Sequence, residues 1–162
     1  MRPHTRPGRR PQIAVAGGSR CSAATARLAR AVGRELAAAG AVLVCGGLGG
    51  VMASAARGAT EGGGIAVGVL PSYDHADGNR YLAVTIPTGL AHARNVVVAA
   101  AGDALIALPG EHGTLSEVAL ARVLRRPVIV LGAWRGLPGV VRARTPREAV
   151  RRALTLARRA AR

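Results

Sequence analysis

A chain of 162 residues is long enough for one domain with a substantial core. Its 23 basic residues are all Arg and face only eight acidic residues, which gives a formal net charge of +15. Without Lys, the chain can form neither a pyridoxal phosphate Schiff base nor a Walker A phosphate loop. The two Cys and four His are scattered, so we predict no disulfide framework and no metal site.

Much of the positive charge lies near the two ends of the chain. Four Arg fall within residues 1–10 and eight within 142–162, without the interleaved aromatic residues of a single-strand stacking surface. This pattern favours a solvated surface over a specific nucleic-acid site. We predict a disordered basic arm over residues 1–11 and a single domain over 12–162 that ends in an Arg-rich helix. No membrane span or signal peptide is predicted, which favours a cytoplasmic protein.

The first half of the domain alternates apolar strands with helices. Strands are predicted at 13–16, 42–45 and 65–70, and helices at 22–39 and 51–61. Ser22 is a predicted helix cap, and the apolar residues of the first helix recur at helical spacing. Glycines stop each helix before the next strand.

The second half continues the alternation less regularly. A short strand is predicted around 83–86, a helix with an apolar run over 96–101, a strand at 104–108 and a helix from Thr114 to about 124. A sixth strand follows at 127–131, and no regular element is predicted for 132–144. The last helix begins at Thr145, where Thr145 and Glu148 form a capping box.

Alternating strands and helices, with strands apolar throughout, predict a Rossmann-like α/β fold: an open, mainly parallel sheet with helices on both faces. Ligands of such sheets bind beyond the carboxyl ends of the strands, where the strand order reverses. Glycine-bearing turns at those ends therefore predict a phosphorylated ligand. NAD is disfavoured, because Met52 stands where its fingerprint needs Gly and no acidic residue ends the second strand.

The stretch from Leu108 to Glu117 combines a strand, a glycine turn and a helix N-terminus. Free N–H groups and the dipole of a first helical turn favour an anion. Other interpretations remain open from spacing alone: Thr114 and Glu117 could simply form a capping box. Arg94 could be a solvated helix arginine, and the glycines at 46–50 merely a tight turn.

Five motifs occur in an order typical of one family. They are Cys45-Gly-Gly-Leu-Gly-Gly-Val-Met52, Gly58-Ala-Thr-Glu-Gly-Gly63, Val67-Gly-Val-Leu-Pro71, Ala93-Arg-Asn95 and Leu108-Pro-Gly-Glu-His-Gly-Thr-Leu-Ser-Glu117. Together they resemble the LOG (Lonely Guy) superfamily over about residues 13–131. Within it, the chain most resembles the small bacterial branch related to molybdenum cofactor carrier proteins. Relatives were often labelled possible lysine decarboxylases, a chemistry for which this chain has no Lys.

The resemblance implies a ligand site and two candidate activities. LOG enzymes hydrolyse a nucleoside 5′-monophosphate to base and ribose 5-phosphate, with a motif Arg and Glu that match Arg94 and Glu117. Carrier relatives hold a phosphorylated pterin cofactor without changing it. No resident cofactor is implied, and a homodimer or higher homo-oligomer is expected from the family. The predicted binding residues are Gly17, Gly18, Ser19, Gly46, Gly47, Gly49, Gly50, Met52, Asn95, Pro109, Gly110, Glu111, Gly113 and Thr114.

Two departures from the enzyme motifs weaken the hydrolase interpretation. Glu111 replaces a motif Gly, which restricts the backbone and places a carboxylate in the expected phosphate turn. There it would oppose an anion, or it could instead hydrogen-bond a ribose hydroxyl. Asn95 replaces a Lys, which removes a positive charge. Our first hypothesis from the sequence is nonetheless a phosphoribohydrolase, and the alternative is a non-catalytic carrier or sensor of a phosphorylated ligand. A protein that contacts nucleic acid through its Arg-rich ends is the third.

Overall fold

Seven strands and five helices make up the computed structural model, which describes residues 8–160. The strands are β1 (Gln12–Ala16), β2 (Val42–Cys45), β3 (Ile65–Leu70), β4 (Val84–Pro87), β5 (Ala104–Ala107), β6 (Val128–Leu131) and β7 (Val141–Ala143). The helices are α1 (Ala23–Ala38), α2 (Gly50–Glu61), α3 (Asn95–Ala101), α4 (His112–Val123) and α5 (Pro146–Ala160), with 3-10 turns η1 (His75–Asp77) and η2 (Ala91–Arg94).

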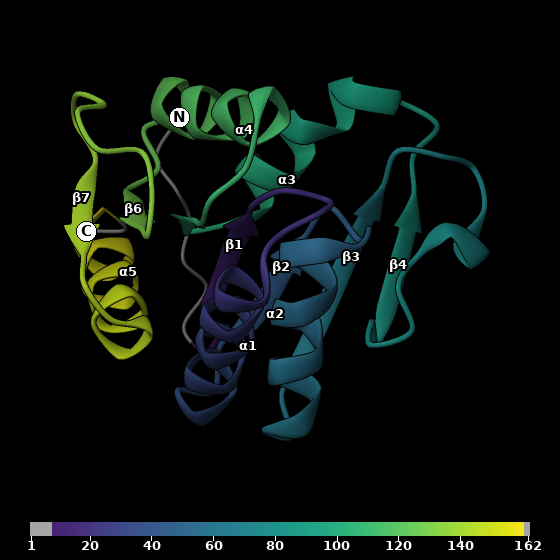
Figure 1. Ribbon diagram of the computed structural model, residues 1–162, viewed down its shortest axis with the longest axis horizontal. Helices are drawn as coiled ribbons and strands as arrows, with labels where there is room; N and C mark the ends of the chain where they lie inside the picture. The colour runs from purple at the N-terminus through teal and green to yellow at the C-terminus, as the bar shows by residue number, and fades with distance from the viewer. Residues whose placement is uncertain (1–7, 161–162) are drawn as a thin grey trace.

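All seven strands are parallel and form one sheet in the order β4-β3-β2-β1-β5-β6-β7 (Figure 1). The chain first builds outward from β1 to β4 and then returns to the other side of β1 with β5. Strand order therefore reverses between β1 and β5, which lie in the middle of the sheet. The predicted Rossmann-like α/β fold is confirmed.

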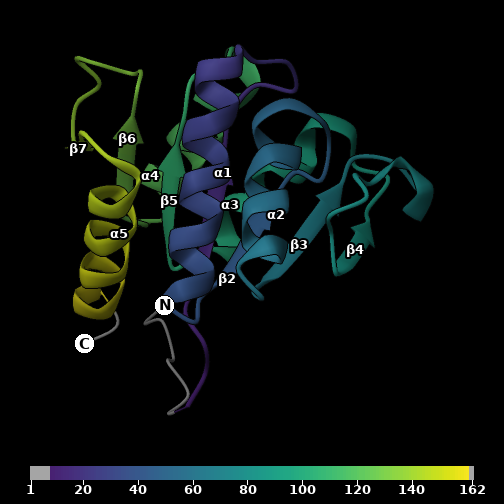
Figure 2. The same cartoon turned by 60° about the horizontal axis from the view of Figure 1, so that its bottom comes forward.

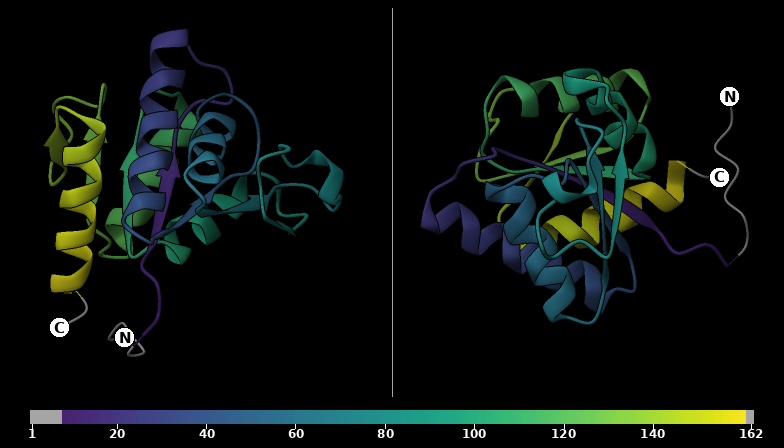
Figure 3. Two further views of the ribbon diagram at one scale, coloured as in Figure 1. Left: turned by 90° about the horizontal axis from the view of Figure 1, so that it is seen from below. Right: turned by 90° about the vertical axis from the view of Figure 1, so that its right-hand side faces the viewer.

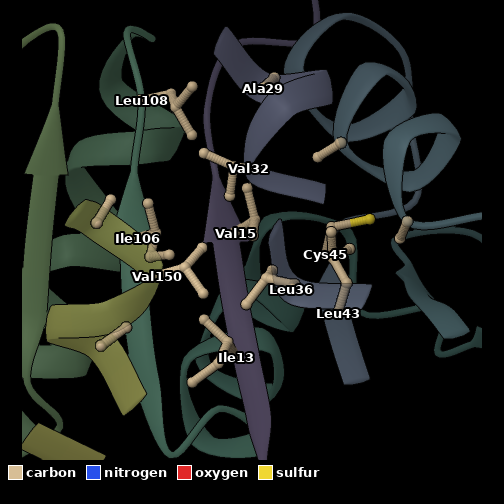
Figure 4. Packing of buried hydrophobic residues seen from close by; sticks show 14 of the residues in the cluster. Ile13, Val15, Ala29, Val32, Leu36, Leu43, Cys45, Ile106, Leu108 and Val150 are labelled. Carbon is tan, nitrogen blue, oxygen red and sulfur yellow. The ribbon is translucent and has the colours of Figure 1, made fainter. Parts of the chain in front are cut away.

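Helices cover both faces of the sheet. Figure 3 shows α3 and α4, in green, on one side and the purple, blue and yellow helices α1, α2 and α5 on the other. The latter three helices lie side by side in Figure 2. Successive residues of a strand point to opposite faces. Ile13 and Val15 of β1 accordingly pack with Val32 and Leu36 of α1 (Figure 4), whereas Ala14 belongs to the core under α3 and α4.

Most predicted elements are present within a residue or two of their expected bounds. Ser22 caps α1, where its hydroxyl accepts from the Thr25 N–H at 3.1 Å. Thr145 likewise accepts from the Glu148 N–H at 3.2 Å at the start of α5. The missed element is β7, which lies in the segment for which no regular structure was predicted. Three residues with an exposed Arg142 are too few to show a strand periodicity.

The helices α1 and α2 are joined at the surface by an ionic cluster around Glu61. Its carboxylate accepts from Arg30 at 2.7 Å, from Arg34 at 2.8 Å and from Arg57 at 2.9 Å. These hydrogen bonds, that of Arg30 first, lower the pKa of Glu61 to about 2. One carboxylate therefore forms hydrogen bonds with three guanidinium groups, which would otherwise repel one another.

We expect Glu61→Gln to lower the thermal midpoint at pH 7 and to lower it much less at pH 2. A depressed carboxyl pKa contributes stability that is present above the unfolded value, about 4.3, and is lost as pH falls through about 2. Thermal unfolding of both proteins across this range measures the difference. Equal midpoint differences at both pH values would show that the cluster contributes nothing through ionisation.

The arginines near the C-terminus lie on the solvent side of α5. Arg147, Arg151, Arg158 and Arg159 are exposed, whereas Ala149, Val150, Ala153 and Ala157 of the same helix are buried. At the other end, residues 1–7 lie outside the described part of the chain, so the disordered arm stays a prediction there. Arg9 pairs with Asp103 beside β1. No helix within residues 8–160 is long and apolar enough to cross a membrane.

Candidate ligand cleft

A cleft of about 240 Å³ opens where the strand order reverses, beyond the carboxyl ends of β1, β2 and β5. This is the place that the parallel sheet predicts for a ligand. Its walls come from the loops after these strands, from η2 and from the start of α4. The lining residues are Gly17, Gly18, Ser19, Arg20, Leu48, Met52, His92, Arg94, Asn95, Glu111, Gly113, Thr114 and Glu117.

The loops after β1 and β5 contact each other through their backbones. The Gly18 N–H donates to the Pro109 carbonyl at 3.0 Å. A Cβ on Gly110 would overlap the Thr114 hydroxyl and lie 2.8 Å from the Gly18 nitrogen. Only glycine therefore allows the two loops to approach so closely, and the cleft wall they form is backbone.

The helix α4 begins earlier than predicted, and this changes the role of Glu117. It starts at His112 rather than Thr114, with Glu111 as the N-cap residue. A capping box would need the carboxylate three residues after the cap, but Glu117 lies one turn farther along. The capping-box interpretation of Thr114 and Glu117 is therefore wrong. Glu111 has φ −117°, an extended conformation that does not need the glycine of the enzyme motif.

Arg94 and Glu117 meet in the interior wall of the cleft. Each side chain is nearly buried, with a residue exposure of 6%. Arg94 Nη1 lies 3.7 Å from Glu117 Oε1 and donates to Asn95 Oδ1 at 3.1 Å. The Arg94 Nε is buried and has no hydrogen-bond partner among residues 8–160. The interpretation of Arg94 as a solvated arginine is wrong, and its guanidinium retains an unused donor.

The backbone around Arg94 is shaped to bring the guanidinium inward. Ala91, at the start of η2, has φ 48°, which is uncommon for a residue other than glycine. Its N–H donates to the Pro71 carbonyl at 2.9 Å. A Cβ on Gly46 would overlap the Arg94 guanidinium, so the glycine at the end of β2 makes room for it.

Burial is the main influence on the ionisation of this pair. It raises the pKa of Glu117 to about 7, although the positive charge of Arg94 acts in the opposite direction. Burial also lowers the pKa of Arg94, which Glu117 and Cys45 partly oppose. Near neutral pH the Glu117 carboxyl can therefore either accept or donate a proton, as a general acid or base must.

Cys45 takes no part in such chemistry. Its side chain is completely buried at the end of β2, and burial raises the pKa of its thiol to about 12. A thiol rather than a nucleophilic thiolate is present at neutral pH.

Asn95 connects two walls of the cleft. Its amide nitrogen donates to Ser116 Oγ at 2.8 Å, and its amide oxygen accepts from Arg94. Ser116 in turn donates to the Gly113 carbonyl at 2.7 Å. An amide can accept from one residue and donate to another, which a Lys cannot do. The departure at this position thus replaces a charge with a link between α3 and α4.

The glycines at 46–50 support the cleft rather than line it. The Gly47 carbonyl accepts from the Asn79 N–H at 2.8 Å, and Gly50 packs against the backbone of Gly18 and Ser19. Within this turn only Leu48 is a lining residue. Six predicted binding residues are not among the residues that line the cleft: Gly46, Gly47, Gly49, Gly50, Pro109 and Gly110.

Three of the lining residues were not among those predicted from the sequence. They are Arg20, Leu48 and His92. Arg20 directly follows Gly17–Ser19 after the first strand, so its place at the carboxyl end could have been found. His92 precedes Arg94 by two residues, but no pattern indicates that η2 turns both toward one cleft. Leu48 is a lone apolar residue among glycines.

Comparison with known proteins agrees with the fold. Residues 10–157 match the SLOG cluster4 family. An uncharacterized protein of Archaeoglobus fulgidus is 42% identical over 128 residues, which cover 75% of this chain and 84% of the relative.

Solved structures of two molybdenum cofactor proteins are also similar. The molybdenum cofactor binding protein of Rippkaea orientalis is 32% identical, with a TM-score of 0.86, and the match covers 91% of this chain and 98% of that one. The Moco carrier protein of Chlamydomonas reinhardtii is 31% identical, with a TM-score of 0.85 and coverage of 93% and 99%.

A more distant structure shares the fold alone. DNA processing protein A of Helicobacter pylori is 21% identical, with a TM-score of 0.72 and coverage of 90% and 80%. The predicted relation to the LOG superfamily and its molybdenum cofactor carrier branch is confirmed. Because the family match spans nearly the whole domain, the chain belongs to the SLOG cluster4 family.

Proposed function

We propose that this protein binds a phosphorylated pterin-type ligand in the cleft and carries it unchanged. The observation that carries the proposal is the similarity to two molybdenum cofactor proteins over almost the full length of each. It favours the carrier, which the sequence offered as the alternative, over the hydrolase, which was the first hypothesis from the sequence. The cleft residues fit such a ligand, because they combine backbone donors with cations and carboxylates.

The anionic part of the ligand has several donors within the cleft. The Glu111 side chain accepts no hydrogen bond from the first turn of α4, so the N–H groups of this turn keep their capacity to bind an anion. Arg94 adds a buried guanidinium whose Nε lacks a partner in the described chain. A guanidinium with a free donor can bind phosphate oxygens through charge-assisted hydrogen bonds.

A second candidate, phosphoribohydrolase, rests on the ionisation of Glu117. A buried carboxyl with a pKa of about 7 beside Arg94 is suited to general base catalysis. Glu117 would accept a proton from water as the water oxygen bonds to the sugar carbon. The bond from that carbon to the base would break, and the base would leave with the electron pair and a solvent proton. The same carboxylate would stabilise the cationic sugar.

One experiment distinguishes the two candidates. Purified protein is incubated with molybdenum cofactor or with AMP, CMP and GMP, and bound cofactor and released base are both measured. For the carrier we expect cofactor to co-elute with the protein and no base to appear. Arg94→Met should weaken retention at least about tenfold, because a charged hydrogen-bond donor is lost. Glu117→Gln should retain cofactor.

Release of base by the wild type, abolished by Glu117→Gln, would instead support the hydrolase. A protein that neither retains cofactor nor releases base would overturn both candidates. The homo-oligomer and the cytoplasmic location expected above remain predictions, which gel filtration and cell fractionation can test. Nucleic-acid contact through the exposed arginines of α5 remains the third hypothesis, and a steep loss of affinity with added salt would support it.

A further inference from the structure

Two residues of opposite charge that form no ion pair within residues 8–160 border the loops after β1 and β5. Arg20 lies in the loop after β1 and Glu111 in the loop after β5, and both residues line the cleft. Both residues are exposed, and neither forms an ion pair with any residue from 8 to 160. The backbone contact between Gly18 and Pro109 holds the two loops together. A ligand at this wall therefore meets a cation and a carboxylate that do not neutralise each other.

The carboxylate of Glu111 has no structural task in the described chain. It stands at the N-cap of α4, where a carboxylate commonly accepts from a first-turn N–H, yet it makes no capping bond. At the equivalent place in α1, Ser22 does accept such a bond. The extended backbone of Glu111 also fits any residue. Its side chain is therefore free to contact a ligand.

The charges of the cleft lining nearly cancel, although the protein as a whole is strongly basic. Arg20 and Arg94 contribute two positive charges, and Glu111 and the ionised form of Glu117 contribute two negative ones. Such a cleft is poorly suited to a purely anionic ligand. It suits a ligand that presents an anionic group at one place and hydrogen-bond donors at another.

An ionised carboxylate can only accept hydrogen bonds, and its two oxygens suit a pair of parallel donors. The 2-amino-4-oxopyrimidine ring offers such a pair, a ring N–H beside an exocyclic amino group. Pterins and guanine both contain this ring, whereas adenine and cytosine lack the pair. Hypoxanthine keeps the ring N–H and loses the amino group.

We propose that Glu111 is a specificity residue that accepts the paired N–H donors of a 2-amino-4-oxopyrimidine ring, while Arg20 adds to Arg94 and the first-turn N–H groups of α4 in binding the anionic group of the same ligand. The proposal rests on the proposed ligand-binding function and deepens it, since the ring class includes pterins. The Glu111 carboxylate, which replaces the glycine of the enzyme motif, would then determine which ring the cleft accepts.

The test uses GMP and IMP, which differ only in the 2-amino group, with affinities measured by calorimetry on the full chain. We expect the wild type to bind GMP about tenfold more tightly than IMP, because one charged hydrogen bond is lost with IMP. Glu111→Gln, which keeps the size but loses one acceptor oxygen, should bring the two affinities within about threefold. Circular dichroism checks that the variant folds.

Arg20→Gln is the matched variant for the anionic end. This variant should weaken the binding of GMP and of IMP by the same factor. The affinity for guanosine, which lacks phosphate, should not change. An unchanged ratio of GMP to IMP affinity in Glu111→Gln would overturn the role of Glu111. An equal gain of affinity for GMP and IMP in Glu111→Gln would also overturn this role, since Glu111 would then only repel phosphate.

The outcome is separable from that of the carrier proposal. Retention of molybdenum cofactor without discrimination between GMP and IMP would overturn the specificity proposal alone. Discrimination without retention of the cofactor would overturn the carrier and leave Glu111 as a specificity residue. Binding of none of these ligands would overturn both.

Discussion

Replacing Glu117 by Gln is expected to stabilise the folded protein by roughly 3 kcal/mol at pH 8 and to change its stability little at pH 4. The folded pKa of Glu117, about 7, is raised above its ordinary value by burial. A raised carboxyl pKa contributes stability that is present below the unfolded value and is lost as pH rises through the folded one. The wild type therefore loses this stability between about pH 4 and 7, whereas Gln mimics the neutral carboxyl throughout.

Urea unfolding of both proteins between pH 4 and 8 measures this effect as a difference, so that other titrating groups cancel. The matched control is Glu111→Gln, which removes an exposed carboxylate from the same cleft. Because Glu111 is exposed and forms no ion pair within residues 8–160, this control should change the stability far less than Glu117→Gln does. If the free energies of unfolding of Glu117→Gln and the wild type instead differ by the same amount at every pH, burial does not disfavour the ionised form of Glu117. Glu117 then cannot act as a base of near-neutral pKa. A measured penalty of this kind in the free protein would support a role of Glu117 in binding or catalysis rather than in stability.

The second large effect is expected at the contact between α1 and α2. A methyl group on Gly58 of α2 would overlap the Arg30 carbonyl oxygen of α1. Gly33 of α1 approaches the Ala55 carbonyl of α2 in the same way. The helices cannot keep this separation with Ala, because backbone atoms rather than flexible side chains are in the way. We expect Gly58→Ala to cost about 2 kcal/mol or more, even after a gain of up to about 1 kcal/mol in helix propensity.

Gly113→Ala is the matched control for stability. A Cβ on Gly113, in the first turn of α4, would have nothing within 4 Å. Only the propensity gain should remain, so this variant should be as stable as the wild type or up to about 1 kcal/mol more stable. Urea unfolding compares all three proteins. Equal stability of Gly58→Ala and the wild type would mean that the two helices can move apart without loss of packing.

Local sequence patterns predicted most of the elements and the rim where the cleft lies. Apolar runs such as 104–107 are buried strands because a central parallel strand is covered on both faces. Caps such as Ser22 act within one turn of the chain, so a local pattern suffices to find them. The carboxyl-end rule then placed Gly17, Gly18 and Gly113 at one rim, because parallel strands all end on the same side.

Other features depend on contacts that no local pattern records. The start of α4 was predicted two residues late, since His112 and Gly113 are weak helix formers and Thr114 resembled a cap. The strand β7 pairs with β6 although only three residues long, because the neighbouring strand supplies its hydrogen bonds. Arg20 reaches the cleft from the loop after β1, and His92 reaches it from η2.

The sequence by itself thus determined the parallel α/β fold, the rim at which the cleft lies and the family motifs with Arg94 and Glu117. Only the tertiary structure decided that this pair is buried and that the pKa of Glu117 is raised to about 7. It also decided that the Glu111 side chain makes no capping hydrogen bond at the start of α4. The physical reason is that strand and helix patterns are local, whereas desolvation and charge pairing depend on residues far apart in the chain.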